Sequence, residues 1–213
     1  ATFGPSVEDI DEMWMSGQSF GEWIDNQMAL PPTTSEDSMA EEVALGAEDN
    51  GFLFRRGWWR AAVTAEDQLR QRMAFALSEI LVVSGQGSDT VRGSSIAAGT
   101  YYDLLVNGAF ANYADLLSDV TYSPAMGLYL GHLRNQKADP ELGIFPDENY
   151  AREIMQLFTI GLWELNQDGT HRLDRHGRSI PTYTNFHITE LAKVMTGFNW
   201  GGALDPLYYV FAP

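Results

Sequence analysis

Residues 146–162 have the sequence Pro-Asp-Glu-Asn-Tyr-Ala-Arg-Glu-Ile-Met-Gln-Leu-Phe-Thr-Ile-Gly-Leu, the most regular helical pattern in the chain. Apolar residues recur along it at helical spacing, on the face that packs against a core: Tyr150, Ile154, Leu157 and Phe158. Asp147 is typical of a helix N-cap, and Gly161 is typical of a helix end. The pattern therefore predicts a helix over residues 148–160.

Similar signals on both sides of this helix predict a mainly α, irregular multi-helix domain. Ser6 and Ser19 are typical N-caps of two short helices near the N-terminus. Ser123-Pro124 predicts a helix start, because proline suits the first helical position. A last helix is expected from about residue 188 to 196. Between these helices, the turn signals Asp168-Gly169 and His176-Gly177 predict a small β-hairpin within residues 162–183.

The chain divides by composition into three parts. We expect a helical hairpin over residues 1–32, an acidic loop over residues 33–54 with some helix near 38–46, and a helical core domain with the β-hairpin insert over residues 55–213. The chain begins with Ala1 rather than Met and ends just after an apolar stretch, residues 207–211. We therefore expect the full protein to continue beyond both ends.

Charge is concentrated in the first quarter of the chain. The formal net charge is −16, and residues 1–54 carry 12 acidic residues with no Lys or Arg, against 17 acidic and 13 basic residues in the remainder. Such a surface repels phosphate backbones and anionic lipids, which argues against nucleic acid as a partner. No apolar run is long enough to span a membrane. The absence of cysteine excludes disulfides, thiolate metal sites and Cys nucleophiles.

Long stretches of the chain resemble a bacterial family, the domain of unknown function family 1800. The resemblance rests on residues 146–162, on the stretch from Tyr101 to Leu130, and on the segments 135–140, 180–184 and 188–192. It implies an exported protein that acts with a partner, and a sulfatase-like protein of the uncharacterised family 1501 is the expected one. It supplies no catalytic residue to carry over. At His187 similar sequences are expected to have an acid, and a His is a weaker cap there.

The start of the helix at 148–160 holds the best candidates for chemistry. Glu148 and Glu153 are candidate catalytic carboxylates, and Arg152 is a candidate clamp for an anion. We also predict a buried polar network that joins this helix to an earlier one: Arg72, Glu79, Asn149, Arg152, Glu153 and Gln156. A purely structural network with acids at the helix N-terminus is the interpretation that we favour, and the catalytic one stays open.

Two patterns resemble metal-binding sequences. Glu164, Asn166 and Asp168 match the first half of a calcium loop, but Arg175 stands where the last acidic ligand belongs. His187 and Glu190 have helical metal-ligand spacing. A turn and exposed side chains explain both patterns as well, so we expect no cofactor and keep calcium as an alternative.

The segment Arg55-Arg-Gly-Trp-Trp-Arg60 could bind a polyanion or stack on sugar rings. We favour the alternative that its arginines pair with the acidic N-terminal quarter. No serine-hydrolase elbow, Walker loop or dinucleotide fingerprint is present. The leading hypothesis is therefore an exported interaction or scaffold protein. The alternative is a hydrolase of extracellular polymers that uses the carboxylates at the start of the helix at 148–160.

Overall fold

The computed structural model describes residues 2–84 and 94–199. These residues form a mainly helical fold, as the sequence predicts. Contacts within the chain divide it into two compact units, residues 1–120 and residues 121–213. None of the described helices is both long and apolar enough to cross a membrane.

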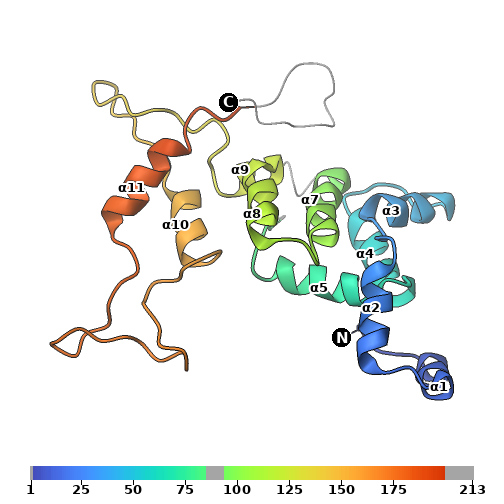
Figure 1. The fold of residues 1–213 in the computed structure, drawn as a ribbon. Coiled ribbons are helices and arrows are strands. Elements are labelled where there is room, and N and C mark those ends of the chain that lie inside the picture. Colours follow the sequence, from blue (N-terminus) through green and yellow to red (C-terminus); the bar gives the residue numbers. More distant parts are fainter. Residues whose placement is uncertain (1, 85–93, 200–213) are drawn as a thin grey trace. The chain divides into compact units, whose positions relative to one another are not determined.

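The first unit holds most of the helices (Figure 1). In chain order they are α1 (Val7–Ser16), α2 (Phe20–Ala29), α3 (Ser35–Ala44), α4 (Leu53–Thr64), α5 (Gln68–Ser78), α7 (Ser95–Asn107) and α8 (Tyr113–Tyr122), the last of which runs across the division. Packing joins α3, α4, α5 and α7 to one another, and α2 to α5. Their core includes Ala74, Leu81, Leu105 and Val106, all fully buried.

Helix α3 lies within the acidic segment 33–54, where the sequence predicts some helix near 38–46, and it begins earlier, at Ser35. Gly57 of α4 makes its close packing possible, because a Cβ there would lie 3.1 Å from the backbone nitrogen of Met39 on α3. The start of α3 is also fixed by a distant residue, since the backbone N–H of Ser35 donates to Asp103 of α7 at 2.6 Å. Both contacts join residues far apart in sequence, so the local pattern of residues 33–54 predicts some helix but not where it starts.

The second unit contains α9 (Pro124–Tyr129), α10 (Asn149–Gln156) and α11 (Asn185–Val194). Helices α10 and α11 pack side by side (Figure 1). Their shared core is small, with Ala151, Ile188 and Ala192 buried and Met155, Tyr183 and Leu191 packed around them.

Helix α10 is shorter than the predicted helix at 148–160. It ends at Gln156, and the backbone N–H of Gly161 then bonds to the carbonyl of Met155 at 2.9 Å. Leu157 and Ile160, which the helical pattern includes, are more than half exposed. The pattern therefore identifies the helix but places its end one turn too late.

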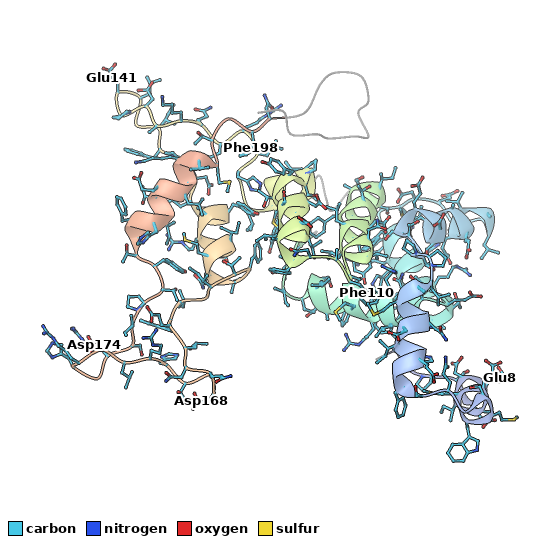
Figure 2. All side chains as sticks on the ribbon, viewed as in Figure 1. Glu8, Phe110, Glu141, Asp168, Asp174 and Phe198 are labelled. Atoms are coloured by element: carbon cyan, nitrogen blue, oxygen red, sulfur yellow. The ribbon has the colours of Figure 1, made fainter. Side chains whose placement is uncertain are left out.

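The predicted β-hairpin at 162–183 is not confirmed. Residues 162–182 make isolated antiparallel bridges, Trp163 with Pro181, Leu165 with His171 and Leu173 with Ser179, and no strand forms within the described residues. The two predicted turns are present, with Gly169 at φ 82° and Gly177 at φ 75°, conformations that favour glycine. Figure 2 shows Asp168 and Asp174 at these two turns.

Three backbone hydrogen bonds close a ring at the base of the two turns. The N–H of Glu164 donates to the carbonyl of Ile180 at 2.9 Å, that of Ile180 to Arg172 at 3.0 Å, and that of Arg172 back to Glu164 at 2.8 Å. A ring of this kind satisfies the backbone of each segment without a continuous ladder. It explains why the alternating sequence pattern folds here without forming a sheet.

Candidate functional site

The candidate carboxylate Glu148 lies at the N-cap of α10 and is half-buried. One carboxylate oxygen accepts from Arg152 at 3.1 Å, and the other accepts from the hydroxyl of Thr189 on α11 at 3.0 Å. The sequence spacing predicts the Glu148–Arg152 pair, because residues four apart share a helix face. Thr189 comes from another helix and was missed. Both oxygens are thus engaged, and the pair ties α10 to α11.

Glu153 differs from Glu148 in its surroundings. Its side chain is half-buried, and its Oε2 atom is buried without a hydrogen-bond partner among the described residues. An unpaired buried carboxylate oxygen is costly, so such a group is a candidate for a functional role. Asn149 on the same helix is exposed and Gln156 is half-buried.

The other two members of the predicted polar network, Arg72 and Glu79, lie in the first unit. Arg72 is half-buried on α5, with its guanidinium 5.2 Å from the ring centre of Phe75 and 5.8 Å from that of Phe3. These contacts are cation–π interactions. Glu79 at the end of α5 is exposed, so the prediction that it is buried is wrong. Phe75 and Ala76 share its stripe with Arg72. Phe75 is half-buried but Ala76 is exposed, so this face of α5 is open to solvent.

The predicted calcium ligands have other partners. Glu164 pairs with Arg172, and the Asp168 carboxylate accepts from the backbone and hydroxyl of Thr170 at 3.0 and 2.7 Å. These bonds lower the pKa of Asp168. The amide of Asn166 donates to the hydroxyl of Thr170 at 3.0 Å. The three side chains therefore stabilise the turn at 166–169.

His187 and Glu190 also have local partners. The Nδ1 atom of His187 accepts from the backbone N–H of Thr184 at 3.0 Å, so Thr184 rather than His187 is the N-cap of α11. Glu190 pairs with Lys193 on the same helix. Within residues 2–84 and 94–199, no group of three or more His, Asp or Glu side chains is arranged to hold a metal ion.

A buried polar cluster around His132 was not identified from the sequence. His132 is 1% exposed, and its Nε2 donates to the carbonyl of Thr121 at 2.9 Å. Its ring packs on Tyr150 with 4.1 Å between centres, and the Tyr150 hydroxyl shares a 2.6 Å hydrogen bond with Thr121 Oγ1. Burial lowers the pKa of His132, while the bond to Thr121 and the charge of Asp147 raise it in part. This neutral imidazole is part of the core of the second unit.

Asn135 extends the cluster toward α10 and α11. Its side-chain oxygen accepts from the backbone N–H of Asp147 at 2.7 Å, and its amide donates to the carbonyls of Asp147 and Met195 at 3.1 and 3.3 Å. Asn135 thereby joins the residue before α10 to the end of α11. A sequence signal for this role is weak, because the partners lie 12 and 60 residues away.

The α1–α2 hairpin exposes more apolar surface than a structural role requires. Neither helix has a buried residue. Val7, Ile10 and Trp14 share one stripe of α1, and Trp14 is 86% exposed. Phe20, Ile24 and Met28 share a stripe of α2 and are at least 40% exposed. We call these six residues the N-terminal apolar stripes.

The acidic residues of the same hairpin surround the stripes, and no Lys or Arg accompanies them: Glu8, Asp9, Asp11, Glu12, Glu22 and Asp25. Figure 2 shows Glu8 on α1. Apolar surface flanked by charges of one sign is typical of a binding surface. Gln27 holds α2 in place, since its side chain bonds to the backbone of Glu66 and Leu69 next to and on α5.

Comparison with known proteins gives one match. The model of the family described as "Protein of unknown function (DUF1800)" matches residues 1–213. Neither the curated proteins nor the solved structures contain a match.

Proposed function

This chain belongs to the DUF1800 family of proteins of unknown function, and on that basis we propose that it is an exported interaction or scaffold protein. It acts with a partner protein in the bacterial envelope or the extracellular space. The observation that carries this proposal is the exposure of the N-terminal apolar stripes. Large exposed apolar side chains are costly in water, and a partner surface that covers them recovers that free energy.

Charge complementarity defines the partner surface. The hairpin has six acidic residues and no basic ones, so its partner presents an apolar groove with a basic rim. The partner that we propose is a sulfatase-like protein of the uncharacterised family 1501. Trp14 is the central anchor, because large exposed aromatic side chains dominate the binding energy of protein interfaces.

Calorimetric titration of this chain with the family 1501 protein from the same bacterium tests the proposal. We expect binding that weakens at least about tenfold in Trp14→Ser and Ile10→Ser. Leu142→Ser is the matched control, since Leu142 is 73% exposed in the second unit and should bind as the unchanged chain does. The proposal is rejected if the unchanged chain does not bind, or if all three variants bind equally well.

A second candidate, a hydrolase of extracellular polymers, is favoured by the unpartnered Oε2 atom of Glu153. A buried carboxylate of this kind can act as a general acid or base. Glu148, five residues before Glu153, supplies the second carboxylate that such a hydrolase needs. The hydrogen bonds of both Glu148 oxygens, with Arg152 and Thr189, argue against the hydrolase.

Dye-linked cellulose, chitin and peptidoglycan are suitable substrates for testing this candidate. If it is correct, the protein releases dye, and Glu153→Gln lowers the rate by at least about 100-fold. Glu190→Gln, on the exposed side of α11, should keep the full rate. Absence of release from all three polymers, or equal rates for Glu153→Gln and the unchanged protein, rejects the hydrolase.

A further inference from the structure

A pocket of about 530 Å³ lies between α4, α5 and α7 in the first unit. Its size falls in the range of small-molecule sites, about 300–1,000 Å³. Helix α4 supplies Arg55, Trp58 and Trp59, α5 and its end supply Phe75 and Glu79, and α7 supplies Tyr102. This pocket is separate from the N-terminal apolar stripes and from α10.

One wall of the pocket is aromatic. The rings of Trp58 and Trp59 meet edge to face with 5.0 Å between centres, and Phe75 packs on Trp58 at 5.7 Å. Trp58 is held from both sides, while Trp59 is 65% exposed. The wall therefore offers a fixed, partly open aromatic surface. The C–H face of a sugar ring packs well on such a surface, because it is apolar and flat.

Polar groups surround this wall. Arg55 and Glu79 are exposed on neighbouring helices, and neither forms an ion pair within the described part of the chain. The Tyr102 hydroxyl is buried, the Trp58 indole N–H donates to its oxygen, and its own proton has no acceptor among residues 2–84 and 94–199. Burial raises the pKa of Tyr102 to about 12, so the hydroxyl keeps its proton and can donate at neutral pH. A donor cation, an acceptor carboxylate and a phenol together match the hydroxyls of a sugar.

We propose that this pocket binds one neutral hexose unit of a polysaccharide, with Trp59 stacking on the ring and Tyr102 donating to a sugar hydroxyl. A neutral ligand fits the lining, because its charged side chains are one cation, Arg55, and one carboxylate, Glu79. A purely apolar ligand would leave the Tyr102 hydroxyl proton without an acceptor in the complex, which is unfavourable. The inference concerns a separate surface and does not depend on the partner proposed above.

Titration with cellohexaose, laminarihexaose and chitohexaose, followed by calorimetry and tryptophan fluorescence, tests the site. We expect at least one of these neutral hexasaccharides to bind. Trp59→Ala should weaken that binding by at least about tenfold, and Tyr102→Phe, which keeps the packing of the ring, by about three- to tenfold. Trp163→Ala removes an exposed tryptophan of the second unit, outside the pocket, and should bind like the unchanged protein.

Circular dichroism of each variant separates loss of binding from loss of folding. If Trp59→Ala does not fold, Tyr102→Phe still decides the question. The site is rejected if none of the three sugars binds at a sugar concentration of about 10 mM, because a dissociation constant above this value is weaker than ordinary specific recognition. It is also rejected if Trp59→Ala and Tyr102→Phe both bind as the unchanged protein does, or if a sulfated hexasaccharide binds more tightly than the neutral ones.

Discussion

Helices α1 and α10 are both amphipathic, yet their stability has different origins. In α1 the side chain of Ser6 accepts from the N–H of Asp9 at 3.0 Å, Asp9 accepts from the N–H of Ser6 at 2.7 Å, and no residue is buried. In α10 the N-cap Glu148 makes no cap bond, the Asp147 carboxylate accepts from the N–H of Asn149 at 2.8 Å, and the helix buries Tyr150 and Ala151. Local bonds therefore stabilise α1, whereas packing against distant residues stabilises α10.

The largest expected effect is at Tyr150. Tyr150→Ala removes a side chain that is 1% exposed, together with its packing on His132, and should lower the free energy of unfolding by about 3–5 kcal/mol. Tyr150→Phe is the matched control and should lose about 1 kcal/mol, the net value of the hydrogen bond with Thr121. Urea unfolding measures both values. Equal losses in the two variants would show that the hydroxyl, rather than the ring, holds α10.

A smaller loss is expected at Asn135, which joins the segment before α10 to the end of α11. Asn135→Ala leaves backbone groups of Asp147 and Met195 without their partner and should cost about 2 kcal/mol. Asn149→Ala, at an exposed position of α10, should change the stability by less than about 0.5 kcal/mol. The same urea titration compares them. A neutral Asn135→Ala would mean that the loop before α10 is held by other contacts.

At α1 the expected loss is local. Ser6→Ala removes the cap and should destabilise α1 by about 1 kcal/mol. Because α1 buries no residue, the urea midpoint of the whole chain should stay unchanged. Hydrogen exchange of the α1 amides measures the local loss, and exchange of the α10 amides is the internal control. Faster exchange in both helices would contradict the independence of α1.

The smallest expected effect is a response of α1 to acid. Hydrogen bonds from the side chain and backbone of Ser6 lower the pKa of Asp9. The cap is therefore complete above the ordinary Asp value of 3.8 and is lost as the pH falls through the lower pKa of the folded helix. NMR chemical shifts between pH 6 and 3 should show α1 fraying while α10 keeps its shifts. Simultaneous loss of both helices would refute the local origin of the effect.

The same comparison explains which parts of the structure follow from the sequence. The caps Ser6 and Ser19 predict α1 and α2 within a residue, because their bonds span three residues. The start of α3 and the true end of α10 escape such patterns, since the bond of Ser35 to Asp103 and that of Gly161 to Met155 decide them. Mainly helical class and the positions of both glycine turns also follow from local signals.

For the candidate site too, the sequence predicts contacts within one helix and misses contacts between distant residues. Spacing along one helix predicts the Glu148–Arg152 pair, and it cannot predict the bond to Thr189, 41 residues away. The cluster of His132, Asn135 and Tyr150 depends on contacts over 11 to 60 residues, so no local pattern marks it. Glu79 looked buried because apolar neighbours share its stripe, and the exposure of Ala76 shows that this face is open.

The ring of three backbone hydrogen bonds that joins Glu164, Arg172 and Ile180 makes residues 162–182 suitable for protein engineering. Each glycine turn leaves the ring and returns to it, so the two ends of the turn stay fixed whatever its tip contains. The tips at Asp168 and His176 contribute no buried side chain. A peptide tag or a fluorescent label inserted at either tip should therefore leave the packing of α10 against α11 intact.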